Sequence, residues 1–378
     1  MKKLGLCLLM AMMALSISMI DYAEAKREKI ISWTAYDLGS TGYAEAAAVG
    51  SALMKAGIRL RVVPCGDDVS RLIPVRTGDV DFGSVGFGSF FVEQGLFEFA
   101  DRSWGPQPMR MIIQVPPVNA APCGLMVRGN SGLKVPADLK GKKVAWVAGA
   151  PAINIVVEAV LAFAGLTLED VQKIGFPSYS AAARAVIDGS VDVAQVSNTA
   201  PVAYEAEASA HGVAWIAVDP NDKRGWERLN KVMPALFPLK ATAGAGISDQ
   251  KPLWTQCQMF PVLCTWKRQD ENLAYTMAKA IQENYDLYKA AHPAMPGWKA
   301  EKGLAVRPQN PYHPGAIKYY KEAGLWNAQN EKWQKEKLEE QAKLKAAWEN
   351  ATKEADEKKI SAKDFTEFWM KKRKEALK

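Results

Sequence analysis

The chain has 378 residues, of which 48% are hydrophobic and 24% are charged, and its formal net charge at pH 7 is +7. The mild basic excess is interspersed with acidic residues, so it is too diffuse for a nucleic-acid reader and is compatible with attraction of anions. The length exceeds the roughly 250–300 residues at which a single hydrophobic core stops growing, so at least two lobes are expected.

The N-terminus has the three-part layout of a cleavable secretory signal. Lys2 and Lys3 precede an apolar run over residues 4–20, and the small-residue site Ala23-Glu24-Ala25 follows. We therefore predict a signal peptide over residues 1–25, a periplasmic mature chain, and no membrane insertion of that chain. An uncleaved anchor is the alternative, although the run falls slightly short of the about 20 apolar residues needed to span a bilayer.

Cysteine usage leaves two readings open. Cys7 lies inside the predicted signal, and four cysteines remain after cleavage: Cys65, Cys123, Cys257 and Cys264. An exported protein permits disulfides, and four cysteines allow three pairings, but free buried thiols fit equally well. None of the four has metal-like spacing, so we expect neither a metal nor a cofactor.

Short apolar, β-rich runs alternate with helical patterns along the chain, which predicts an α/β fold with a largely parallel sheet. The expected strands lie at 29–34, 59–63, 80–85, 110–115, 124–128, 143–147, 191–196 and 214–218. The expected helices lie at 42–56, 69–77, 151–164, 181–188 and 273–290.

An internal echo indicates two similarly wound lobes. Residues 71–82 and 183–193 each read as a helix closed by glycine, at Gly78 and Gly189, followed by a Val-Asp step into a strand. Candidate crossings between lobes are the Pro-rich 116–122 and the Gly/Ala-rich 241–246. We therefore assign 26–118 and 245–326 to lobe I, 119–244 to lobe II and 327–378 to a charged helical extension. Two crossings allow hinge closure over a ligand.

Five motifs, in chain order, together resemble the TAXI family of solute-binding proteins that serve TRAP transporters. They are Gly39-Ser40-Thr41-Gly42-Tyr43, the turn at 77–82, Leu-Lys-Gly-Lys-Lys-Val at 139–144, Ala-Gly-Leu-Thr at 164–167 and His-Pro-Gly-Ala at 313–316. The resemblance covers roughly residues 30–325. It implies a two-lobed type II periplasmic binding protein (Venus flytrap), a small carboxylate-bearing solute in the cleft, and TRAP permease subunits as the membrane partner. Glu45 and Ala46 stand where the family pattern has tyrosines, a departure that is compatible with a different ligand.

The segment from Gly39 to Tyr43 is the first candidate for the binding site, because a strand ends and a helix begins there. The first-turn N–H groups and the helix dipole favour an anion. Ser40 and Thr41 add hydroxyl donors, while Gly39 and Gly42 let the backbone approach a ligand. The alternative is that Ser40 or Thr41 only caps its own helix.

Further ligand-binding candidates follow other predicted strands, where open α/β sheets bind ligands. Lobe I adds Phe87 and Ser89, and lobe II adds Ser197, Asn198 and Thr199. Near the start of the helix at 151–164, Ala150 offers no side-chain cap and Asn154 offers an amide. Phe87 has the alternative of an ordinary core position.

The sequence gives catalysis little support. Only three histidines are present, and no Walker A loop, zincin helix, Cys-x-x-Cys pair or nucleophile elbow occurs. We therefore predict no catalytic residues and a protein that is not an enzyme. An enzyme on the same fold is the rival of a different class, and the substrate-binding protein of an ABC importer or a ligand sensor is the rival within the binding class.

Residues 327–378 are charge-dense and rich in helix formers. Ser361 to Asp364 reads as a capping box, and Phe365, Phe368 and Trp369 share one helical face. We expect these helices to wrap back onto the lobes. The alternative is a partner-docking module that uses residues 371–374, in which case truncation after Gln329 abolishes partner binding and spares ligand binding.

Overall fold

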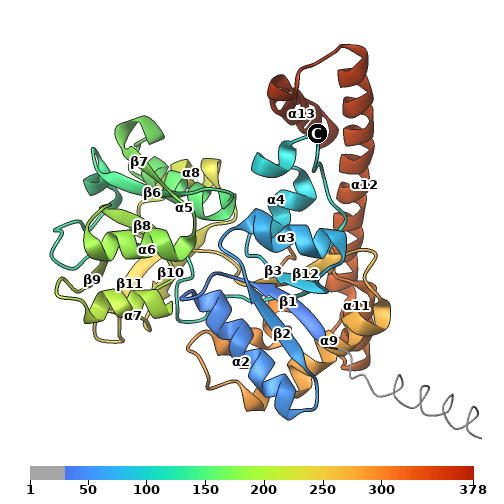
Figure 1. The fold of residues 1–378 in the computed structure, drawn as a ribbon, viewed down its shortest axis with the longest axis horizontal. Helices are drawn as coiled ribbons and strands as arrows, with labels where there is room; N and C mark the ends of the chain where they lie inside the picture. Colours follow the sequence, from blue (N-terminus) through green and yellow to red (C-terminus); the bar gives the residue numbers. More distant parts are fainter. Residues whose placement is uncertain (1–29) are drawn as a thin grey trace, which may run out of the picture.

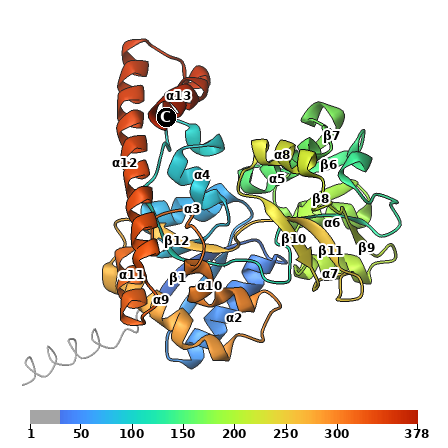
Figure 2. The same ribbon diagram turned by 180° about the vertical axis from the view of Figure 1, so that it is seen from behind.

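The structure is a computed structural model that describes residues 30–378, so the predicted signal peptide lies outside the described residues. Two α/β lobes lie side by side, and a long C-terminal helix runs along one of them (Figures 1 and 2). Over residues 30–378 we find no helix with the length and apolarity needed to cross a bilayer.

Lobe I is built on a five-stranded sheet of order β2-β1-β3-β12-β4. The strands are β1 (Ile31–Ala35), β2 (Leu60–Pro64), β3 (Phe82–Ser84), β4 (Met109–Gln114) and β12 (Val262–Trp266). The helices are α2 (Thr41–Lys55), α3 (Asp68–Thr77), α4 (Gly88–Gln94), α9 (Glu271–Glu283), α10 (Ala300–Leu304) and α11 (Pro314–Glu322), with short 3-10 turns at Phe97–Ala100, Tyr285–Leu287 and Met295–Trp298. Strand β12 runs antiparallel to both of its neighbours.

Lobe II repeats this plan with the order β7-β6-β8-β5-β9. Its strands are β5 (Gly124–Arg128), β6 (Lys143–Val147), β7 (Gln172–Phe176), β8 (Val193–Val196) and β9 (Val213–Trp215), and a separate pair is formed by β10 (Phe237–Ala241) and β11 (Leu253–Cys257). Its helices are α5 (Pro151–Phe163), α6 (Tyr179–Asp188), α7 (Pro201–Ala208) and α8 (Lys223–Val232), with 3-10 turns at Pro136–Leu139 and Leu168–Asp170. Strand β5 is the antiparallel member here.

The echo seen in the sequence corresponds to equivalent structure in the two lobes. Gly78 ends α3 with φ 94° and Gly189 ends α6 with φ 86°, the left-handed conformation that glycine tolerates. The aspartate after each turn then accepts the backbone N–H of its own lobe's first parallel strand: Asp81 from Ser32 and Asp192 from Lys143, both at 2.8 Å and both 49 residues apart. The predicted two-lobed α/β fold is therefore confirmed.

The chain crosses between the lobes twice. The first crossing, residues 115–123, joins β4 to β5, where the Pro-rich stretch predicted it. The return crossing is residues 258–261, because β11 still packs on lobe II: Gln256 donates to the carbonyl of Cys123 at 2.6 Å, and Val218 donates to that of Trp254 at 2.9 Å. The predicted return near 241–246 falls instead in the loop between β10 and β11, since glycine and alanine there serve a hairpin connection.

The C-terminal extension consists of α12 (Ala328–Glu357) and α13 (Ala362–Ala376), which wrap back onto lobe I as expected. Figure 1 shows α12 flanking the lobe and α13 folded down beside α4. Trp369 is fully buried, packs on Trp348 at a centroid distance of 4.8 Å, and donates to the carbonyl of Gly95 at 2.7 Å. Ser361 caps α13 by accepting the N–H of Asp364.

Candidate ligand-binding site

The two lobes touch across a nearly closed cleft. Thr41 Oγ1 in lobe I donates to Ser197 Oγ in lobe II at 2.8 Å, and the backbone N–H of Asp68 donates to the carbonyl of Gly149 at 3.1 Å. A cavity of about 50 Å³ remains between them. It is lined by Tyr36, Asp37, Ser40, Thr41, Gly66, Asp68, Arg71, Gly86, Pro122, Ala152, Ile153, Tyr179, Gln195, Ser197, Gln258 and Phe260.

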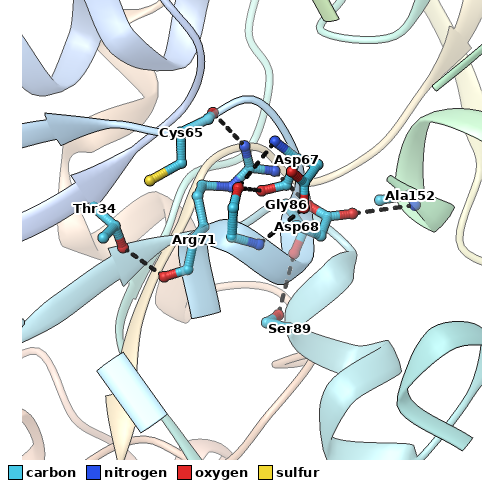
Figure 3. Close-up of polar contacts among 9 residues, drawn as sticks. Thr34, Cys65, Asp67, Asp68, Arg71, Gly86, Ser89 and Ala152 are labelled. Atoms are coloured by element: carbon cyan, nitrogen blue, oxygen red, sulfur yellow. Dashed lines mark hydrogen bonds and ion pairs between the residues drawn. The ribbon is translucent and has the colours of Figure 1, made fainter. Parts of the chain in front are cut away.

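Arg71 supplies the only cation among these lining residues, and it is 3% exposed. Helix α3 directs it inward because Leu72 and Val75 bury the same side of the helix against the core. The guanidinium forms an ion pair with Asp68 and donates to the carbonyl of Cys65 at 3.3 Å (Figure 3). It also lies 4.1 Å from the centre of the Tyr36 ring. Arg71 is thus held in one orientation at the floor of the cleft.

Asp68 connects the two lobes. Its side chain is 2% exposed, and one oxygen pairs with Arg71 while the other accepts the N–H of Ala152 at 3.3 Å (Figure 3). Ala152 lies in the first turn of α5, which has no side-chain cap and has Pro151 at its first position. Burial raises the pKa of the Asp68 carboxyl, and the neighbouring Arg71 guanidinium opposes that rise.

Three buried polar atoms of residues that line this cavity have no hydrogen-bond partner within residues 30–378: Tyr36 Oη, Arg71 Nε and Gln258 Oε1. They come from the end of β1, from α3 and from the return crossing, so they meet only in the folded protein. An unsatisfied buried polar group costs about 1–3 kcal/mol. All three atoms belong to residues that line the same cavity, where buried polar groups ordinarily have partners.

The residues at the start of α2 serve two purposes: capping the helix and lining the cleft. Ser40 caps α2 by accepting the N–H of Tyr43 at 3.1 Å, and it also lines the cavity. Thr41 is turned to lobe II, where its hydroxyl also lies 3.2 Å from that of Thr199. A Cβ on Gly42 would meet the Tyr36 ring at 2.1 Å, so this glycine makes room for Tyr36. The carbonyl of Gly39 accepts a hydrogen bond from the N–H of Val202 at 3.1 Å.

The remaining predicted residues are placed as follows. Tyr43 packs on the core of lobe I, and Phe87 lies against Phe90 and Phe91. Ser89 donates to the carbonyl of Gly86 at 3.1 Å. None of these three lines the cavity.

In lobe II the structure brings Ser197 to the cavity wall and keeps the other candidates in supporting positions. Asn154 pairs with both backbone groups of Val147, at 2.8 and 3.0 Å. Asn198 accepts the N–H of Ala121 at 3.0 Å, next to the first crossing. Ala150 is buried and accepts backbone bonds of the α5 first turn.

Sequence reasoning missed the residues that carry the charge and the unsatisfied atoms: Tyr36, Asp37, Asp68, Arg71 and Gln258. One signal was present, because Asp68 and Arg71 lie three residues apart on a helix face that otherwise holds Leu72 and Val75. An ion pair on an apolar face is costly unless it serves a specific contact. Gln258 offers no comparable signal in the sequence.

A second titratable group lies beside the cleft, near the first crossing. Glu45 of α2 is fully buried and accepts from Trp298 Nε1 at 3.0 Å. Its other carboxylate oxygen has no hydrogen-bond partner in the part of the chain that the structure describes. Burial raises the pKa of Glu45 to about 8. His292 lies 4.0 Å from that free oxygen and reaches the carbonyl of Thr199 in lobe II at 3.1 Å.

All four cysteines in residues 30–378 are free thiols, which resolves the question of pairing in this structure. Burial raises the pKa of the Cys257 thiol. Within the same range no group of three or more His, Cys, Asp or Glu side chains is arranged to hold a metal ion.

Several solved structures are similar to this chain over most of its length. The alkanesulfonate-binding protein SsuA from Xanthomonas axonopodis pv. citri, bound to MOPS, is 18% identical with a TM-score of 0.43, over 82% of this chain and 84% of that one. A periplasmic sulfonate-binding SsuA of a sulfonate ABC transporter from Methylobacillus flagellatus KT is 16% identical with a TM-score of 0.39, over 79% and 88%. PhnD1 from Prochlorococcus marinus (MIT 9301), in complex with methylphosphonate, is 13% identical with a TM-score of 0.41, over 70% and 92%.

No curated protein sequence matches the chain significantly. A family profile does match, and it spans residues 41–324, which include both sheets except β1 and most of the cavity-lining residues. Because this match covers well over half of the chain, the protein belongs to the NMT1-like family.

Proposed function

We propose that the protein is an extracytoplasmic solute-binding protein that captures a small polar solute between its lobes and delivers it to a membrane transporter. The observation that carries the proposal is the set of three unpartnered buried atoms, Tyr36 Oη, Arg71 Nε and Gln258 Oε1, around one interlobe cavity. Water satisfies these groups when the lobes open, and a solute satisfies them when the lobes close. Membership of the NMT1-like family is consistent with this role.

Binding without chemical transformation fits the cavity better than catalysis. The lining residues include neither histidine nor cysteine, and the hydroxyls of Thr41 and Ser197 are bonded to each other. No lining hydroxyl is therefore paired with a general base of the kind that activates a nucleophile. We accordingly propose that the protein is not an enzyme, and a turnover screen beside a ligand screen tests this.

Two transporter classes are candidates for the partner. The motif resemblance favours a TRAP-type permease, whereas one of the similar structures is described as part of an ABC transporter. The ABC importer is thus the class that a known structure names, and the TRAP assignment depends on sequence motifs alone. The reading frames beside the gene separate the two, because TRAP permease subunits and an ABC ATPase are different proteins.

Export is the second part of the proposal. N-terminal sequencing of the protein from a periplasmic fraction is expected to begin at Lys26, and an intact Met1 on that protein would count against a cleaved signal.

Solute capture is tested by native mass spectrometry and small-angle scattering on freshly purified protein. We expect a retained small molecule, and a smaller radius of gyration with that molecule than after its removal. Replacing Arg71 with methionine should release the molecule, while the same change at Arg184, an exposed residue of α6, should not. A chain that retains nothing and keeps one radius of gyration in every condition would refute the function.

A further inference from the structure

The charges of the cleft bear on the kind of solute it accepts. Three charged side chains line the cavity, namely Asp37, Asp68 and Arg71. Arg71 is already in an ion pair with Asp68, and both are at least 97% buried. The cavity therefore presents one more carboxylate than cation, which disfavours an entering anion.

The helix ends that would welcome an anion are also occupied. In lobe II, the first-turn N–H of Ala152 in α5 donates to Asp68 at 3.3 Å, and that of Ser180 in α6 donates to Asp37 at 3.0 Å. Both acceptors are carboxylates of lobe I. They stand at the positions where a helix dipole and free N–H groups stabilise bound negative charge.

We propose that Asp68 sets ligand specificity by charge, so that the cleft accepts a solute without net negative charge. This inference rests on the proposed solute-binding function, and it departs from the anionic, carboxylate-bearing ligand that the sequence predicts. Asp68 neutralises Arg71 and fills the first turn of α5, so a solute carboxylate would have to compete with it for both.

The unpartnered atoms indicate which chemical group of the solute would pair with them. Arg71 Nε needs a hydrogen-bond acceptor, and Gln258 Oε1 needs a donor. A carboxamide or lactam carries an acceptor oxygen and a donor N–H on the same carbon, whereas a carboxylate offers acceptors only. The rings of Tyr36 and Phe260, 4.8 Å apart, supply an apolar wall for the rest of the molecule.

The test uses acetate and sulfate as anion probes on the mature chain, with sodium chloride at matched ionic strength as reference. The wild type should show no specific stabilisation in thermal melts. Asp68→Asn frees Arg71, so titration calorimetry should show both anions binding about ten- to a hundredfold more tightly than to the wild type. Asp192→Asn makes the same change at a lobe II residue that does not line the cavity. Its affinity for both anions should match that of the wild type.

Two results would overturn the inference. The first is that the wild type binds the anions and that Arg71→Met abolishes this binding. The second is that Asp68→Asn folds but binds acetate and sulfate no more tightly than the wild type does. Asp37→Asn is the second variant, in case the first does not fold, and it should gain anion affinity to a smaller extent. Anion binding in the wild-type cleft would leave solute capture standing and remove only the charge assignment. Failure of every solute to close the lobes would instead remove the proposed function.

Discussion

Lobe I and lobe II share strand order and turn chemistry, but they differ in where buried charge is found. Among residues 30–378, the buried charged side chains are Glu45, Asp68, Arg71, Glu93 and Arg110 in lobe I and Lys337 in the extension. The buried polar residues of lobe II are neutral, such as Asn154, Gln195 and Ser197. One lobe therefore holds the ionic groups of the site, while the other closes over them with hydroxyls and helix N–H groups.

The largest expected effect concerns the extension that only lobe I carries. Replacing Trp369 with alanine removes a fully buried ring and its bond to Gly95, so we expect the free energy of unfolding to fall by about 3–5 kcal/mol. Urea denaturation measures it. Trp254 in lobe II is 41% exposed, and its replacement should cost much less. Equal losses would show that the extension does not stabilise lobe I.

The next effect is a pH dependence of the free energy of unfolding, which arises from a buried carboxyl in lobe I. The pKa of Glu45 is raised to about 8 in the folded protein, from 4.5 for an exposed carboxyl. Between these values the unfolded chain loses a proton that the folded chain keeps, so stability should fall as pH rises, by about 1.4 kcal/mol per pH unit.

Glu45→Gln should therefore reduce the slope of unfolding free energy against pH between about 5 and 8. Glu93, whose pKa burial also raises to about 8, should contribute a similar slope of its own. The matched change in lobe II, Glu205→Gln, alters an exposed side chain and should leave the slope as it is. An unchanged slope in Glu45→Gln would mean that this carboxyl is ionised in the folded state.

Much of this fold could be predicted from local signals, because glycine turns and apolar runs recur in the same order in both lobes. The strand β7, Gln-Lys-Ile-Gly-Phe, was missed since it lies at a sheet edge and is mostly polar. Strand β12 was missed because a short apolar run of five residues has no periodicity that distinguishes a strand from a helix.

The candidate site was less predictable than the fold. The start of α2 was found from its Gly-Ser-Thr-Gly pattern, and Ser40 and Thr41 do line the cavity. Arg71 and Gln258, in contrast, are brought together only by the return crossing of the chain. No local sequence pattern relates two such distant positions. Helix-capping rules consider only residues near the helix start, so they do not reveal that Asp68 of lobe I accepts the first-turn N–H of α5 in lobe II.

A smaller effect tests the contact between the lobes. Thr41→Ala removes the bond to Ser197, so the closed form should lose about 0.5–1.5 kcal/mol, or roughly two- to tenfold in affinity for a co-purified solute. Ser40→Ala removes the α2 cap and should cost about 1 kcal/mol of stability with little change in affinity. Calorimetric titration and melting of both variants give the comparison, and the reverse pattern would contradict the assignment of these two hydroxyls.

The smallest effect is expected on the surface of lobe II. Arg184 and Glu205 form an ion pair at 3.1 Å, with side chains 54% and 47% exposed. Solvent screening limits such a pair to about 0–1 kcal/mol, so replacing Glu205 with glutamine should barely change the denaturation midpoint. A loss above this range would place an energetically important charge in lobe II and weaken the contrast between the lobes.

The bonds that join the lobes also have a kinetic consequence. Opening must separate Asp68 from Ala152, Asp37 from Ser180 and Thr41 from Ser197 within one movement, since all three lie across the same cleft. We therefore expect solute release to be limited by the rate of this opening and to be nearly independent of solute concentration. A transporter that pulls on either lobe would then act as a catalyst of release, and the residence time of the solute would be set by the protein's own contacts.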